Sequence, residues 1–159
     1  TSIQGGLRIE GYDVAHMSGK DTVGVMTVFI DGEKASGEYK KFKLNPETGN
    51  NDIKNLEEIL TRRYAHAEWC FPDIAVVDGG EPQKNRAEKI IHHYSPKTEV
   101  VAVVKDEHHK ARGIIGVEQV VSKHAKEILF VNAEAHRFAI AYYRKLSRLS
   151  HRRPRDMSR

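Results

Sequence analysis

The run Asp-Ile-Ala-Val-Val-Asp at residues 73–78 is followed by Gly79-Gly80 and then by Pro82. Its central residues are apolar on both faces of an extended chain, which is typical of a central strand in a parallel sheet. The two glycines end that strand, and the proline suits the first turn of a helix. A buried strand that leads directly into a helix indicates an α/β fold.

Upstream of this strand, three runs have the alternation or the β-branched and aromatic content of strands. They cover residues 7–16, 22–30 and 39–44, with a turn signal at residues 19–21 and a hairpin signal at Asp31-Gly32. These runs predict an antiparallel meander.

The rest of the chain alternates between helical hydrophobic spacing and apolar strand-like runs. We therefore predict one α/β domain with a mixed sheet of five or six strands, three antiparallel strands followed by parallel ones, flanked by helices. The further predicted elements are a helix from a cap at Asn51 or Asp52 to about Ala67, a helix over 82–94, a strand over 98–105, a short strand or hairpin within 113–121, and a helix over 122–149 with a break near Asn132.

The composition limits the kind of protein. With 159 residues, 39% hydrophobic and 30% charged, the chain suits one globular domain. No apolar run approaches the roughly 20 residues of a membrane span. The single Cys70 cannot form an internal disulfide, so we expect a cytoplasmic protein without a membrane partner. The chain begins at Thr1, which indicates processing or excision from a longer protein.

Positive charge is concentrated toward the C-terminus. From Arg137 onward the net charge is +7, whereas residues 1–136 carry −3. This asymmetry indicates either a polyanionic partner or a solvated charged tail. We expect residues 1–149 to form the domain and 150–159 to form a basic, disordered tail. The candidate polyanion contacts on the last helix are Arg137, Arg144 and Lys145.

Two aspartates lie at the ends of predicted strands. Alternation puts Asp13 on the face of Ile9 and Asp78 on the face of Ile74. If these strands are parallel neighbours, the two carboxylates lie side by side and repel unless a proton or a cation separates them. Such oxygen ligands suit Mg²⁺ or Mn²⁺. Each aspartate alone has an ordinary turn or cap role as its alternative.

His136 lies on the stripe of the last helix that is predicted to face the sheet, together with Asn132 and Ala133. A histidine that reaches two carboxylates can bind the metal, or activate or orient a water. A histidine on an apolar face is more often a packed core residue, so both interpretations stay open.

Four segments resemble one family, in the same order and with compatible spacing: residues 8–16, 60–64, 73–83 and 134–145. They are similar to the C-terminal endonuclease domain of UvrC, a nuclease subunit of bacterial nucleotide excision repair, over roughly residues 7–149. The resemblance implies a ribonuclease-H-like fold and a metal-dependent endonuclease that cuts damaged double-stranded DNA on the 5′ side of a lesion. It also implies the UvrB–DNA complex as a partner if the chain is part of a longer protein.

The resemblance assigns catalytic roles to Asp13, Asp78 and His136, with the two aspartates as metal ligands. Asp52 resembles a further acidic position of the family, and a helix cap is its structural alternative. The family pattern favours phosphate contacts by Lys105, Arg62 and Arg63. Lys105 ends a predicted strand. Arg62 and Arg63 lie on a predicted helix, where a solvated face is the alternative.

The sequence differs from the family pattern at three positions. Ala15 stands where family members usually carry serine, and Glu81-Pro82 replaces Lys-Gly in a glycine-rich loop, which should weaken a phosphate contact. The other domains of the family are not matched, so we expect an excised domain or a shortened relative. Two further functions stay open: another ribonuclease-H-like nuclease of the endonuclease V type, and a non-catalytic DNA-binding module.

Overall fold

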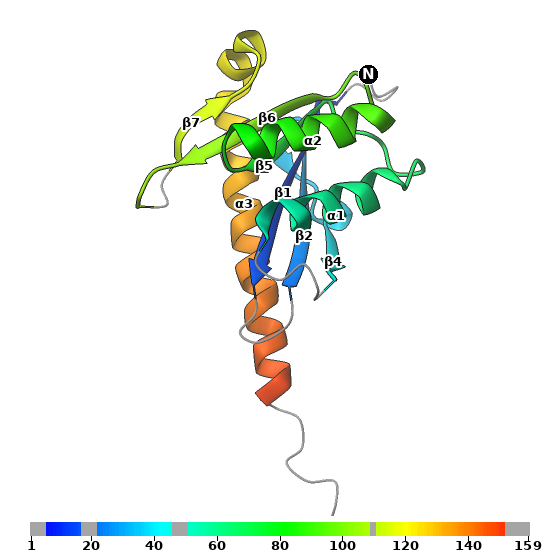
Figure 1. Cartoon of the computed structure of the whole chain (residues 1–159), viewed down its shortest axis with the longest axis vertical. Helices are drawn as coiled ribbons and strands as arrows, with labels where there is room; N and C mark the ends of the chain where they lie inside the picture. Colours follow the sequence, from blue (N-terminus) through cyan, green and yellow to red (C-terminus); the bar gives the residue numbers. More distant parts are fainter. Residues whose placement is uncertain (1–5, 17–21, 46–50, 109–110, 152–159) are drawn as a thin grey trace, which may run out of the picture.

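The computed structural model describes residues 6–16, 22–45, 51–108 and 111–151. Within these segments the strands form one mixed sheet of seven strands, and the helices lie on its two faces (Figure 1). The elements are β1 (Arg8–His16), β2 (Thr22–Ile30), β3 (Glu33–Lys34), the short 3₁₀ helix η1 (Ser36–Glu38), β4 (Lys40–Lys43), α1 (Asp52–Tyr64), β5 (Ile74–Asp78), α2 (Glu81–Tyr94), β6 (Glu99–Lys105), β7 (Ala111–Ile115) and α3 (Glu118–His151).

The order of the strands is β3-β2-β1-β5-β6-β7, and β4 also pairs with β2. β1 is antiparallel to β2 and parallel to β5, and β5 is parallel to β6. The predicted α/β class, with an antiparallel meander followed by parallel strands, is therefore confirmed. β1 lies in the middle of the sheet, where the antiparallel and parallel parts meet.

The sheet is apolar on both faces because each face is covered by helices. On one face α1 and α2 pack against a buried cluster that includes Tyr12, Leu60 and Ile91. On the other face α3 packs through residues such as Val131 against strand residues that include Ile9. Figure 1 shows that the long part of α3 runs along the sheet and beyond it, after a bend near the start of the helix. Side chains of α3 can therefore reach the strand ends.

Gly11 allows α3 to lie close to β1. A Cβ at this position would lie 2.9 Å from the carbonyl oxygen of Val131 and 3.2 Å from Thr27 Oγ1. The Thr27 hydroxyl already donates to the same carbonyl at 3.2 Å, so neither neighbour can move away freely.

We expect Gly11→Ala to lower the free energy of unfolding by about 1–3 kcal/mol, because the added methyl overpacks this contact. Urea denaturation measures the effect. Gly37→Ala is the matched control, since a Cβ there meets nothing within 4 Å. Equal stability of the Gly11→Ala and wild-type proteins would contradict the prediction.

The N-terminal half differs from the prediction in its detail. Asp31 and Gly32 both have positive φ, 52° and 81°, as a tight hairpin turn requires. The residues after this turn form the extra strand β3, and the expected strand over 39–44 is shortened to β4. These changes raise the strand number from the five or six expected to seven among the described residues. α1 ends at Tyr64 rather than near Ala67.

The C-terminal half has two differences of its own. Val120 and Val121 belong to α3 and not to a strand; their side chains pack on the cluster around Ile9, which explains the strand-like pattern. The break in α3 lies at His124, with φ −121° and ψ 15°, rather than near Asn132. Asn132 is polar within an apolar stripe because it binds a side chain of the sheet, and it does not interrupt the helix.

Some predictions fall outside the described residues. They include the turn at 19–21, most of the loop over 45–50, and the basic tail from residue 152; α3 continues through His151. None of the helices formed by the described residues is long and apolar enough to span a bilayer.

Candidate active site

The sheet brings Asp13 and Asp78 to the same edge. β1 and β5 are parallel neighbours, which is the condition on which the sequence argument for this pair depended, with Ile9 opposite Ile74 and Gly11 opposite Val76. Two residues further along each strand, the same register places Asp13 beside Asp78. Alternation along the strands directs both toward the face that α3 covers.

Asp13 is held on two sides. The backbone N–H of Val14 donates to its Oδ1 at 2.8 Å, and His136 Nδ1 lies 3.1 Å from its Oδ2. An ionised carboxylate only accepts hydrogen bonds, so when Asp13 is ionised Nδ1 is the donor in this pair. The Asp13 side chain is 13% exposed and that of His136 is 56% exposed. His136 is therefore not a packed core residue.

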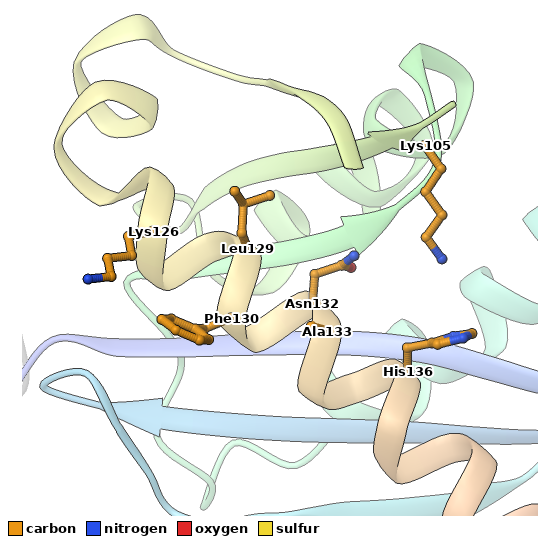
Figure 2. Close-up of a pocket in the computed structure, with 7 residues that line it drawn as sticks. All are labelled: Lys105, Lys126, Leu129, Phe130, Asn132, Ala133 and His136. Carbon is orange, nitrogen blue, oxygen red and sulfur yellow. The ribbon is translucent and has the colours of Figure 1, made fainter. Parts of the chain in front are cut away.

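Asp78 has a different set of partners. Lys105, at the end of β6, places Nζ 3.1 Å from Asp78 Oδ1. Asn132 Nδ2 donates to the same oxygen at 3.4 Å. Figure 2 shows Asn132 and His136 on α3 and Lys105 around one space. Sequence reasoning did not include Asn132 among the site residues, although its position one helical turn before His136 on the same face was a usable signal.

The electrostatics of the pair follow from its burial. Burial raises the pKa of Asp13 above its ordinary value, and the charge of Asp78 raises that pKa further, against the opposing effects of the Val14 N–H and His136. The ionised form of Asp13 is thus less favourable here than in water. A cation placed between the two carboxylates would remove this penalty.

The donor set fits a hard divalent cation. No three His, Cys, Asp or Glu side chains in the described part of the chain form a complete ligand cage. Mg²⁺ does not require one, because it is commonly bound by one or two carboxylates, with waters and substrate phosphate completing the shell. The ammonium group of Lys105 already lies against Asp78 as a stand-in cation. Asp13 and Asp78 can therefore hold Mg²⁺ or Mn²⁺.

Asp52 lies at the start of α1 and is 74% exposed. The helix cap is Asn51, whose side chain accepts from the N–H of Lys54 at 3.0 Å, so the cap role considered for Asp52 is wrong. The carboxylate of Asp52 instead meets His16 Nε2 at 3.3 Å. His16 ends β1, three residues after Asp13, so this contact ties α1 to the strand that carries the site.

The prediction that Arg63 contacts phosphate is contradicted by its environment. Its side chain is fully buried and makes paired hydrogen bonds to Glu10, from Nε at 2.8 Å and from Nη2 at 2.7 Å. Glu10 also accepts from Arg8 Nε at 2.9 Å and from the Tyr12 hydroxyl at 2.7 Å. Alternation along β1 explains this arrangement, because Glu10 points to the face opposite Asp13 and must be neutralised under α1.

The other predicted basic contacts are spread over both faces. Arg62 is on α1, where Nη1 donates to the carbonyl oxygen of Lys43 at 2.6 Å. Arg137 is paired with Glu134 on α3, through Nε at 2.6 Å and Nη2 at 2.9 Å. The structure thus brings Lys105 to the aspartates but leaves Arg62 on the opposite layer. Arg144 and Lys145 are exposed further along α3.

Residues 4–140 match the family described as the UvrC RNase H endonuclease domain. The chain belongs to this family. Its sequence is 35% identical over 163 residues to the UvrABC system protein C of Clostridium botulinum strain 657, covering 88% of this chain and 26% of that protein. It is 36% identical over 146 residues to the UvrABC system protein C of Caldicellulosiruptor saccharolyticus, covering 87% and 25%. The chain spans about a quarter of the length of these relatives.

Solved structures with a similar arrangement are more distant. The endonuclease V of Ciona intestinalis, solved with inosine-containing DNA, is 14% identical with a TM-score of 0.43, covering 79% of this chain and 57% of that one. The catalytic domain of human endonuclease V is 15% identical with a TM-score of 0.43, covering 64% and 46%. Likeness at this level adds nothing to the assignment of function. The ribonuclease-H-like class rests on the UvrC family match together with the observed sheet.

Proposed function

We propose that this domain hydrolyses a phosphodiester bond of damaged double-stranded DNA, at the incision on the 5′ side of a lesion in bacterial nucleotide excision repair. The observation that carries the proposal is that Asp13 and Asp78 lie near each other at one edge of the sheet, with His136 Nδ1 3.1 Å from Asp13 Oδ2. The UvrC family match supports DNA as the substrate. As part of a longer protein the domain would act on the UvrB–DNA complex, in the cytoplasm.

Asp13 and Asp78 hold Mg²⁺ or Mn²⁺ in this proposal. When bound, such an ion stabilises negative charge on the phosphoryl group and lowers the pKa of a bound water. His136 acts on the attacking water. Because Nδ1 keeps its proton on Asp13, Nε2 is left as the ring nitrogen that can accept a proton from the water. The exposure of the ring supports this role, since water can reach it.

Lys105 and Asn132 support the carboxylates. Without the metal, Lys105 offsets the charge of Asp78; in the complex, its ammonium is placed to meet a phosphate oxygen. Asn132 orients Asp78 through its amide. Asp52 is proposed to assist this site through His16, which it contacts at the end of β1.

Affinity for DNA is proposed to come from the exposed cations of α3. Glu134 neutralises Arg137, so Arg144 and Lys145 contribute more of the attraction to phosphate. Arg62 lies on the other layer and would meet only DNA that wraps around α1. Non-catalytic DNA binding would use the same cations but would not need the aspartate pair.

We expect the purified protein to nick ultraviolet-irradiated supercoiled plasmid in Mn²⁺ or Mg²⁺, and not in EDTA, because two carboxylates alone do not activate water. Agarose gel electrophoresis measures the conversion to the nicked form. Equal nicking in EDTA would contradict the metal role. DNA binding without nicking in either metal would favour the non-catalytic module.

We expect His136→Phe to reduce the nicking rate by roughly 10²–10⁴-fold, the usual scale of general acid–base catalysis. Phenylalanine keeps the ring volume and removes both nitrogens. Since the side chain is 56% exposed, the midpoint of thermal unfolding should change little. A stable and fully active His136→Phe protein would exclude a role for His136 in handling water.

A further inference from the structure

A hollow of about 520 Å³ opens along α3 (Figure 2). Its lining residues include Lys105 and Asn132, which contact Asp78, and His136, which contacts Asp13. Most of its lining comes from α3 residues spaced three or four apart, which form one face of the helix. It shares Lys105, Asn132 and His136 with the candidate active site, so it continues that site. The lining residues are Lys105, Lys126, Leu129, Phe130, Asn132, Ala133 and His136.

The part of the hollow away from the aspartates is apolar and open. Phe130 is 56% exposed and Leu129 is 38% exposed. A single exposed apolar residue is ordinary. Two exposed apolar side chains that line one hollow beside the candidate active site are less ordinary, and an exposed aromatic ring such as that of Phe130 can stack on a nucleobase.

The lysines are the charged residues among those that line the hollow. None of the seven lining residues is acidic, and two are lysines. Lys105 contacts Asp78, whereas the exposed Lys126 forms no ion pair with any residue that the structure describes. An apolar ring beside the ammonium group of Lys126 is complementary to a nucleotide, which combines a flat apolar base with an anionic phosphate.

The separation of Phe130 and His136 along the axis of α3 is compatible with Phe130 contacting a nucleotide of the cleaved strand. Phe130 precedes His136 by six residues, which is roughly 9 Å along the helix axis. A DNA strand rises about 3.4 Å per nucleotide. Along the helix axis alone, the offset between Phe130 and His136 therefore corresponds to about two to three nucleotides.

We propose that this hollow is a nucleotide subsite, in which the base stacks on Phe130 and a neighbouring phosphate meets Lys126. In an intact duplex both faces of each base are covered, so the ring can stack only on a base that is unpaired or displaced. The subsite rests on the proposed function and adds to it a preference for DNA that is locally unpaired near the cut.

Fluorescence anisotropy in EDTA tests the subsite without cleavage, using a labelled duplex with a short internal unpaired bubble and a fully paired duplex of the same length. The wild-type protein should bind the bubble more tightly. Phe130→Ala should weaken binding to the bubble by about tenfold, the scale of losing one stacked base. Its binding to the paired duplex should not change. Leu149→Ala, at another exposed apolar residue of α3, is the matched control.

Two further variants complete the test. Phe130→Leu keeps an apolar side chain of similar bulk but has no flat ring. It should therefore lose the preference for the bubble duplex, as Phe130→Ala does. If the Phe130→Ala protein does not fold, Phe130→Leu takes its place in the test. Lys126→Ala should weaken binding to both DNAs. It should also reduce the slope of the logarithm of the association constant against the logarithm of the salt concentration by about one, as expected for the loss of one phosphate contact.

The failure modes are distinct. If the wild-type protein binds neither DNA, the proposed function itself fails. If it binds both and the two Phe130 variants retain the bubble preference, the subsite is overturned while the nuclease proposal stands, and an apolar protein segment becomes the better occupant of the hollow.

Discussion

Replacing Asp13 or Asp78 by asparagine is expected to reduce metal-dependent nicking by about 10³-fold or more, because the metal's stabilisation of transition-state charge amounts to several kcal/mol. Asparagine keeps the shape of each side chain and removes the charge that would hold the cation. Initial rates of plasmid nicking at saturating Mn²⁺ measure the effect. Asp73→Asn is the matched control, since Asp73 immediately precedes β5 at the end of that strand opposite Asp78.

The same variants separate a catalytic role from a structural one. Burial raises the pKa of Asp13, so ionised Asp13 destabilises the folded protein above its ordinary pKa. Without metal, Asp13→Asn should therefore keep or raise the midpoint of thermal unfolding. Full nicking activity in either aspartate variant would refute the assignment of the site. A large drop in the thermal stability of Asp13→Asn would show instead that Asp13 has a structural role.

The largest expected loss of stability follows from Arg63. Its fully buried guanidinium is paired with the equally buried Glu10. Removing one partner of such a pair leaves an uncompensated charge in the core and costs about 3–5 kcal/mol. We expect Arg63→Ala to lower the free energy of unfolding by this amount, measured by urea denaturation.

Arg62→Ala is the neighbouring control for this prediction. The Arg62 side chain is 45% exposed, so its loss should change the free energy of unfolding by less than about 1 kcal/mol. The double variant Arg63→Met with Glu10→Gln should recover part of the loss, because it removes the second buried charge as well. Similar stability of the two single arginine variants would contradict the burial of Arg63.

Much of the fold follows from local patterns. The run at residues 73–78 predicted a buried parallel strand because apolar residues occupy both of its faces, and β5 is that strand. Alternation then placed Asp13 and Asp78 on defined faces, so one parallel pairing was enough to put them side by side. The register of a strand fixes the face of every residue in it, which is why this part of the site could be predicted.

Helix α3 shows where local patterns fail. Asn132 interrupts an apolar stripe and suggested a break, whereas the helix passes through it and the amide reaches Asp78. The distortion lies at His124 instead. A polar residue on a buried helix face is ambiguous until the residue opposite it is known.

The sequence by itself determined the α/β class, the meander, and the strand ends and faces on which Asp13 and Asp78 lie. Only the tertiary structure decided that β1 and β5 are neighbours, which brings the two carboxylates side by side with His136 against Asp13. It also decided that Arg63 is neutralised inside the core by Glu10 while Arg62 stays exposed, and that Phe130 borders the candidate active site. The physical reason is that periodicity specifies which face of an element a residue occupies. The environment of that face depends on partners far away in the chain, as Glu10 and Arg63 are, 53 residues apart.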